Sequence, residues 1–187
     1  DTICEGSSTD LSLQISVDGP WQLQYSKDGT AASEQFATAT GKLSLSPTIS
    51  TDYIFNQITD KNNCSNTLSQ SWLLTVEELQ TANAGIDQTF DRQYSTQLDA
   101  EPANQNSAGK WKLISGSKAI IVDTLDANTT VDSLAVGINK FEWEITPQVC
   151  PASKDTMLVT VNQYTTYNGF SPDGDHINDL FVIEGAN

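Results

Sequence analysis

The residues best placed for chemistry are the oxygen-bearing side chains of one short stretch near the C-terminus. Asp173, Asp175, Asn178 and Asp179 follow one another closely around a glycine. Carboxylate and amide oxygens at this spacing can converge on one hard cation, and the predicted ion is calcium. An EF-hand loop is not expected, because its turn glycine is replaced by Asn178. A tight turn whose carboxylates accept backbone amides explains the same residues, so both interpretations stay open.

Catalytic side chains are not expected. The single histidine, His176, lies among acids with no nucleophile motif beside it, whereas a catalytic triad needs a histidine between an acid and a nucleophile. The chain has no metalloprotease, phosphate-loop or dinucleotide-binding motif. Glu142 and Glu144 occupy alternate positions of an apolar strand pattern, which predicts a water-facing pair and not a glycosidase cleft. We therefore predict a protein that is not an enzyme.

The three cysteines are Cys4, Cys64 and Cys150. Cys4 and Cys64 bracket the first half of the chain, and we expect them to form a disulfide in an oxidising compartment. The odd number leaves Cys150 either free or paired outside this segment. The wide spacing of the three thiols argues against a zinc site.

The elements that would position these residues are short strands. Apolar and polar residues alternate along most of the chain, which is typical of half-buried β-strands, and turn-forming residues separate the runs. The runs in the first half are centred on Leu11 to Val17, Trp21 to Tyr25, Leu43 to Leu45, Tyr53 to Ile58 and Trp72 to Val76. Those in the second half are centred on Ala84 to Phe90, Ser95 to Leu98, Trp111 to Ile114, Ala119 to Val122, Thr129 to Leu134, Phe141 to Ile145 and Met157 to Val161.

This pattern predicts an all-β chain of tandem immunoglobulin-like β-sandwiches, since about seven short strands in some 80 residues are typical of that fold. The expected boundaries are 1–79 and 80–163 for the two sandwiches and 164–187 for the truncated start of a third, C-terminal β module. We expect the four tryptophans to lie in the cores, because an indole fills the space between two sheets. They are Trp21, Trp72, Trp111 and Trp143.

The charge excludes one class of partner. The formal net charge is −15, and each predicted module is acidic on its own. A nucleic-acid partner is not expected, because phosphate backbones need a basic face. No stretch approaches the roughly 20 apolar residues of a membrane-spanning helix, and the first residues resemble neither a signal peptide nor a native start.

Several motifs resemble known repeats. The run Ala82 to Thr89 (ANAGIDQT) is similar to the opening of immunoglobulin-like repeats in surface proteins of Bacteroidetes bacteria, and 137–143 and 150–153 match later parts of that repeat. Ile3 to Gly6 and Asp60 to Cys64 resemble a related repeat. Ile86 and Asp91 stand where the repeat usually has Pro and Cys, so the resemblance leaves Cys150 without its expected partner.

The run from Asn168 to Phe181 resembles the start of the C-terminal domain of gliding-motility-associated proteins, with Asp173 in place of Asn and His176 in place of Gly. That domain is the type B sorting signal of the type IX secretion system. The resemblance implies a secreted cell-surface protein, adhesin-like, that meets the secretion machinery through this module.

Three functions follow from these observations. The leading hypothesis is a non-catalytic structural spacer that leads into a secretion and anchoring signal. The second is a binding module for cell-surface polysaccharide or a partner protein, for which Tyr164 and Tyr167 are the aromatic cluster outside the predicted core. The third is a pair of accessory modules of a secreted hydrolase.

Overall fold

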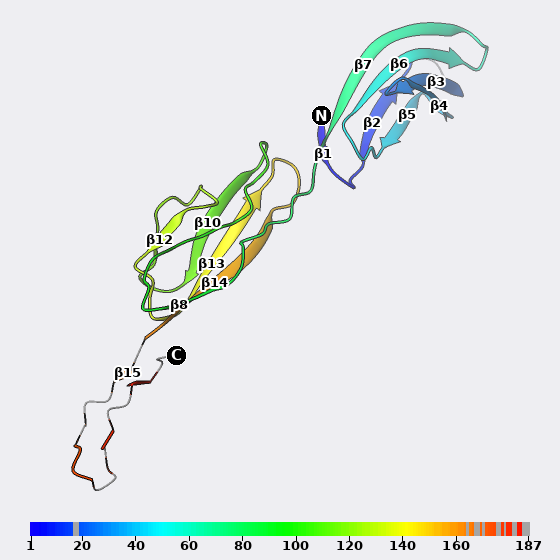
Figure 1. Cartoon of the computed structure of the whole chain (residues 1–187). Coiled ribbons are helices and arrows are strands. Elements are labelled where there is room, and N and C mark those ends of the chain that lie inside the picture. The colour runs from blue at the N-terminus through cyan, green and yellow to red at the C-terminus, as the bar shows by residue number, and fades with distance from the viewer. Residues whose placement is uncertain are drawn as a thin grey trace. The chain divides into compact units, whose positions relative to one another are not determined.

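The computed structural model describes residues 1–16, 19–163, 165, 166, 169, 171–174, 177, 179, 180, 183 and 184. Every regular element in these residues is a strand (Figure 1). The chain divides into two compact units. The first unit comprises Asp1–Leu79 together with Gln148–Pro151, and the second unit comprises Gln80–Pro147 and Ala152–Asn187.

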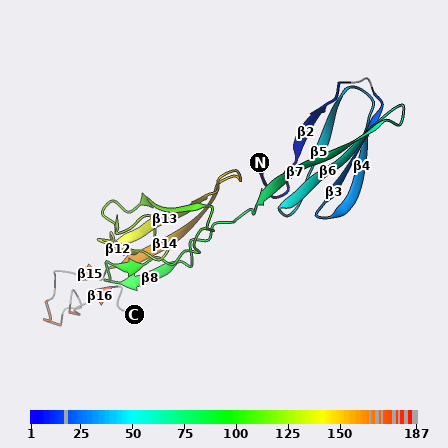
Figure 2. The same ribbon diagram turned by 90° about the horizontal axis from the view of Figure 1, so that it is seen from above.

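The first unit is a two-layer sandwich. Its larger sheet has the order β1-β7-β6-β3-β4, with β1 parallel to β7 and the other neighbours antiparallel, and its smaller sheet pairs β2 with β5. Figures 1 and 2 show β2 and β5 lying against one side of the larger sheet. The strands are β1 (Thr2–Cys4), β2 (Thr9–Gln14), β3 (Trp21–Lys27), β4 (Thr30–Phe36), β5 (Thr40–Leu45), β6 (Thr51–Asp60) and β7 (Ser65–Glu77).

Local sequence fixes the turns of this unit. Asp28 and Gly29 join β3 to β4 with φ of 46° and 78°, the left-handed conformation that a two-residue hairpin loop requires. At the turn from β6 to β7, the Asp60 carboxylate accepts the N–H groups of Asn62 and Cys64, both at 2.8 Å. This short polar side chain therefore replaces backbone hydrogen bonds that the turn leaves open.

The core of the first unit is built on period-two burial. Trp21 is buried and stacks on Phe36 with ring centroids 4.3 Å apart. Its indole N–H donates to the Thr38 carbonyl oxygen at 2.7 Å, so the one polar atom of the ring is satisfied. The buried residues are Trp21, Leu23, Phe36, Leu43, Leu45, Tyr53, Phe55 and Leu74.

The second unit is also a two-layer sandwich. Its sheets have the orders β10-β13-β14-β8 and β11-β12-β9, and β15 pairs with β16. In Figure 1 β12 lies to one side of the sheet that contains β10, β13 and β14. The strands are β8 (Gln88–Asp91), β9 (Thr96–Gln97), β10 (Ala108–Ser115), β11 (Ile120–Ile121), β12 (Thr130–Asp132), β13 (Gly137–Thr146), β14 (Ser153–Asn162), β15 (Thr165–Thr166) and β16 (Ile183–Glu184).

Two tryptophans from neighbouring strands form the centre of the second core. Trp111 of β10 pairs with Trp143 of β13 in the ladder, and their ring centroids lie 5.2 Å apart. Their N–H groups donate to the carbonyl oxygens of Ala127 and Glu101. Gly109 lies beneath the Trp143 ring, where a Cβ would come within 2.3 Å of the indole. The absence of a side chain at Gly109 therefore makes room for this indole.

The predicted all-β class and the strand periodicity are confirmed. Trp21, Trp111 and Trp143 are buried as expected, whereas Trp72 is only partly buried. The prediction missed β4, because Phe36 is its single buried residue and the strand lies at the sheet edge. The module boundaries after residues 79 and 163 stay predictions, and the grouping of Gln148–Pro151 with the first unit was not anticipated.

Asn139 provides a test of the second core. It is fully buried within β13; its Oδ1 accepts the Ala135 N–H at 3.0 Å, and its Nδ2 donates to the carbonyls of Ala135 and Val159 at 2.8 and 3.2 Å. Asn139→Leu should lower the free energy of unfolding of this unit by about 3 kcal/mol, because buried backbone groups lose their partners. Urea unfolding followed by tryptophan fluorescence measures the change. Asn162→Leu, at an exposed asparagine of the same sheet, should have little effect, and equal losses in the two variants would contradict the assignment.

Candidate functional site

The predicted calcium ligands are only partly within the described residues. Asp175 and Asn178 lie outside them. Asp179 accepts the Gly174 N–H at 3.0 Å, and the Asp173 N–H donates to the Ser171 carbonyl oxygen at 2.8 Å. Where the structure is described, no group of three His, Cys, Asp or Glu side chains could hold a metal. Calcium binding at 173–179 therefore stays a prediction.

The carboxylates predicted to face water do so in ion pairs. Glu142 and Glu144 lie on the outer face of β13, where Lys154 contacts them at 3.0 and 3.2 Å, and Lys112 also contacts Glu144. The hydrogen bond from Lys112 and then that from Lys154 lower the pKa of Glu144. A carboxyl held ionised in this way is poorly suited to act as a general acid at neutral pH. His176, Tyr164 and Tyr167 lie outside the described residues.

The predicted disulfide between Cys4 and Cys64 is wrong. Cys4 is bonded to Cys150, with Cα atoms 4.8 Å apart, and Cys64 is an exposed free thiol. The reason lies in the register of β1, which places Cys4 opposite Glu77 at the last residue of β7. Cys64 immediately precedes the first residue of that strand, about 40 Å away at ~3.3 Å per residue. Cys4 and Cys64 therefore bracket the first half of the chain without meeting in space.

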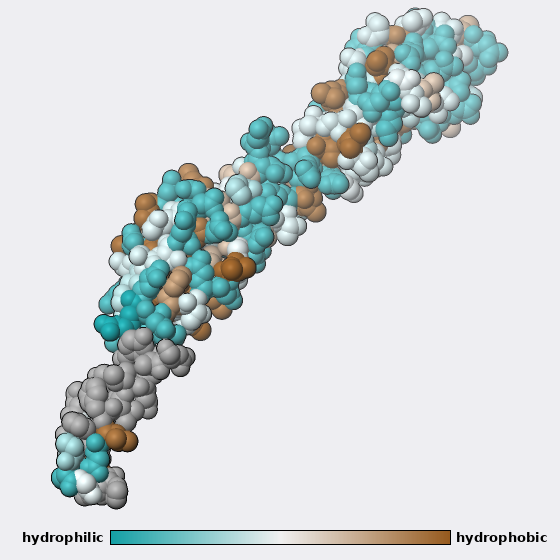
Figure 3. Space-filling view, in the orientation of Figure 1, coloured by the Kyte–Doolittle hydropathy of each residue, from teal (hydrophilic) through white to brown (hydrophobic). Residues whose placement is uncertain are grey.

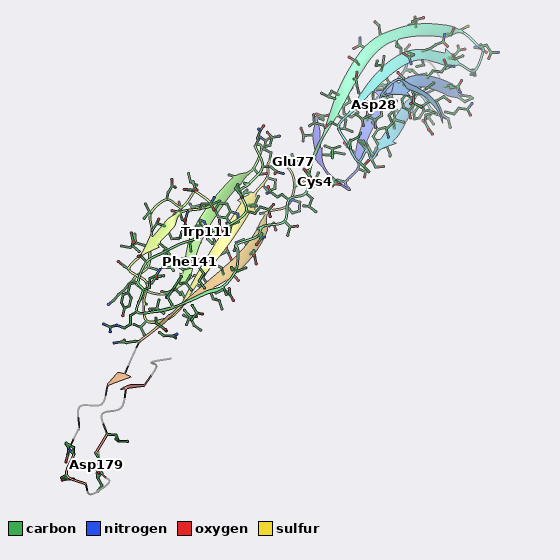
Figure 4. All side chains as sticks on the ribbon, viewed as in Figure 1. Cys4, Asp28, Glu77, Trp111, Phe141 and Asp179 are labelled. Atoms are coloured by element: carbon green, nitrogen blue, oxygen red, sulfur yellow. A yellow bond between two sulfur atoms is a disulfide. The ribbon has the colours of Figure 1, made fainter. Side chains whose placement is uncertain are left out.

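A carboxylate lies beside this disulfide. Glu77 accepts the N–H groups of Gln148, Val149 and Cys150 at 2.8, 2.7 and 2.8 Å. Three successive amides directed at one anion form a small anion-binding concavity of backbone dipoles. Figure 4 shows Glu77 and Cys4 next to each other at the end of β7. We call the Cys4–Cys150 bond together with the Glu77 carboxylate and its three amides the clasp.

The electrostatics of the clasp follow from those amides. Hydrogen bonds to the carboxylate, that from Val149 first, lower the pKa of Glu77, because they stabilise its charged form. The Glu77 backbone carbonyl accepts the Glu5 N–H at 2.8 Å. The strand end, the carboxylate and the disulfide thus hold Gln148–Pro151 within the first unit.

The clasp fits a structural role better than a chemical one. Both sulfurs are buried and already bonded, so neither supplies a nucleophilic thiolate. The carboxylate already accepts three backbone N–H groups. Sequence analysis missed Glu77 altogether, since a glutamate at a strand end carries no signal of the loop that it binds.

Comparison with known proteins places the fold. No family model and no curated protein matches the chain. Among solved structures, the I-band fragment I67-I69 from titin is 11% identical, with a TM-score of 0.54 over 88% of this chain and 63% of that one. The two immunoglobulin domains of DIP-gamma (IG1+IG2) are 14% identical, with a TM-score of 0.50 over 86% and 92% of the two chains. The predicted immunoglobulin-like β-sandwich fold is confirmed, and the chain spans less than two thirds of the titin fragment.

The cysteine pairing can be tested directly. Proteolysis without reduction should release a Cys4–Cys150 cross-linked peptide, while Cys64 is alkylated in the folded protein because its thiol is exposed. Mass spectrometry identifies both products. In Cys64→Ser the cross-link should persist unchanged. Recovery of a Cys4–Cys64 peptide from wild-type protein would contradict the clasp.

The carboxylate of the clasp should act in a pH-dependent way. The folded-state pKa of Glu77 is lowered. The stabilisation that its carboxylate gives the loop is therefore fully present above the unfolded-state pKa near 4.5, and it is lost as the pH falls through the folded-state pKa. Hydrogen exchange of the Val149 and Cys150 amides should therefore be faster in Glu77→Gln than in wild type at pH 6. This difference should shrink as the pH falls below about 4.5.

Glu78→Gln, which changes the neighbouring glutamate, is the matched control and should exchange like wild type. If the ratio of the exchange rates in Glu77→Gln and wild type does not change with pH, the carboxylate charge has no part in holding the loop.

Proposed function

We propose that this chain is a non-catalytic spacer segment of a secreted cell-surface protein, in which the Cys4–Cys150 disulfide takes residues 5–149 off the path of mechanical load. The single observation that carries this proposal is the position of that bond. It joins Cys4, the last residue of β1 in the first unit, to Cys150. Cys150 is followed by Pro151 and then by β14, the last long strand of the second unit.

The covalent path through the chain explains the shielding. Tension that enters at Asp1 passes along β1 to Cys4, crosses the disulfide to Cys150 and continues into β14. Residues 5–149 lie off this path. Their strands therefore bear no direct tension as long as the bond is intact. A segment that must keep its length under load gains from this arrangement.

The disulfide also supports an extracellular location. Structural disulfides persist in oxidising compartments and are rare where thiols are kept reduced. No helix in the described residues is long and apolar enough to cross a membrane. The resemblance of 168–181 to a type B sorting module supports export by the type IX secretion machinery, and the acidic loop at 173–179 supports a calcium ion there.

The buried positions of the tryptophans argue against a role for them in binding sugars. Recognition of sugar rings needs exposed aromatic faces, and Trp111 and Trp143 are each only 1% exposed. The carboxylate pair on β13 is neutralised by lysines. These observations favour a spacer over a glycan-binding or catalytic module.

Single-molecule stretching from the two ends tests the proposal. The oxidised protein should release only the few residues before Cys4 and those after Cys150. Cys4→Ser should release residues 5–149 as well, about 500 Å more at roughly 3.6 Å per residue. The increase in contour length is the measured quantity.

Cys64→Ser is the matched control, since it removes the exposed thiol and keeps the disulfide. It should extend no further than wild type. Full extension of oxidised wild-type protein would overturn the shielding role.

A further inference from the structure

One edge of the first unit lacks a neighbouring strand. β7 pairs with β6 from Ser65 to Thr67 and, after a shift in register, from Gln70 to Leu74 on one side, whereas β1 covers only Thr75 to Glu77 on the other side. Within residues 1–16 and 19–163, no strand neighbours the outer edge from Ser65 to Leu73. Such an edge presents unpaired N–H and C=O groups to any extended chain.

The existing hydrogen bonds show which backbone groups face outwards. The Thr75 N–H donates to the Asp1 carbonyl oxygen at 2.9 Å, and the Glu77 carbonyl accepts from Glu5 on the same side. Because alternate residues of a strand direct these groups to the same side, Leu73 and Ser71 also face the open edge. β1 therefore occupies the end of an edge that continues unpaired for several residues.

An apolar cavity lies under this open edge. It has a volume of about 730 Å³ and is bounded by the end of β2 on one sheet and by β3, β6 and β7 on the other. It exists because the smaller sheet has only two strands and leaves the larger one partly uncovered. In Figure 3 apolar side chains are visible among polar ones on the surface of the first unit. The apolar lining consists of Leu13, Ile15, Trp21, Leu23, Phe55, Ile58 and Leu68.

We propose that the β7 edge from Ser65 to Leu73 binds an extended peptide segment of a partner protein as an added parallel strand. Alternate side chains of a strand point to one face, so every second residue of the bound segment would enter the cavity. This is the β-strand addition mode, in which main-chain hydrogen bonds provide affinity and pockets for alternate side chains provide specificity. The direction follows from β1, which is itself parallel to β7 on this edge.

Charge and shape restrict the partner further. Residues 1–79 carry three lysines against ten acidic residues, and Asp60 lies at the cavity, so the bound segment should be neutral or basic with apolar residues at every second position. A sugar ring fits poorly, because Trp21 and Phe55 line the cavity with only 3% and 8% of their surface exposed, too little to stack a sugar ring on either aromatic face. This interaction is independent of the load-shielding role.

Binding of a synthetic peptide tests the proposal on the full chain. The probe is a nine-residue peptide that alternates valine and threonine between terminal lysines, and its control has the same composition with the valines consecutive. Cys64 lines the cavity and is a free thiol, so its alkylation rate reports occupancy. Saturating alternating peptide should slow alkylation at least tenfold and slow hydrogen exchange at Ser71 and Leu73. The control peptide should do neither.

Two variants locate the site. Ser71→Pro removes an edge N–H that β6 does not use, and Leu68→Asn makes the cavity lining polar; each should weaken peptide binding at least tenfold. Leu79→Asn is the matched control, because this leucine is exposed and lies beyond β7 and outside the cavity lining, and it should bind like wild type. Thermal unfolding establishes that each variant is folded.

Equal binding of the two peptides, or binding unchanged in both Ser71→Pro and Leu68→Asn, would overturn the proposal. Concentration-dependent dimers in sedimentation that disappear in Ser71→Pro would also overturn it, because the occupant would then be a second copy of this chain.

Discussion

A sheet of half-buried strands needs a second layer, and the number of strands in that layer determines how well each unit is closed. The second unit faces four strands with three, and fourteen residues from both sheets and their connections form one buried cluster. The first unit faces five strands with two, and its cluster has eight. The same alternating pattern thus yields a closed sandwich in one case and a sandwich open along β7 in the other.

The clasp compensates for this openness at one end of β7. Because β1 has only three residues, the hydrogen bonds of its ladder contribute little stability. It nevertheless pairs with Thr75–Glu77 of β7. The disulfide fixes its last residue, and Glu77 holds the amides of the same loop that supplies Cys150. The other end of β7 has no such support, and the apolar cavity and the free thiol of Cys64 are both found there.

Much of the fold could be predicted from alternation alone, because burial of one sheet face is a local property of the sequence. Trp21, Trp111 and Trp143 were correctly placed for this reason. The disulfide was not predictable in the same way, since Cys4 and Cys150 are separated by 146 positions and meet only through the parallel register of β1. Glu77 and the β7 edge were missed because each depends on which segments become neighbours, and a single sequence contains no record of that. Calcium binding by Asp175 and Asn178 stays a prediction made from the spacing of these residues.

The two parts of the clasp respond to different conditions, which argues that they have separate roles. A disulfide withstands changes in pH but is broken by reductants, whereas the Glu77 contacts depend on the ionised carboxylate and are indifferent to redox state. Tension along the chain acts on the covalent bond, and a few hydrogen bonds to an accessible carboxylate cannot replace it. The carboxylate instead orders the backbone of Gln148 to Cys150, which keeps Cys150 opposite Cys4. Glu77 is therefore best understood as the residue that positions the loop, and the disulfide as the bond that would bear the load in the proposed spacer.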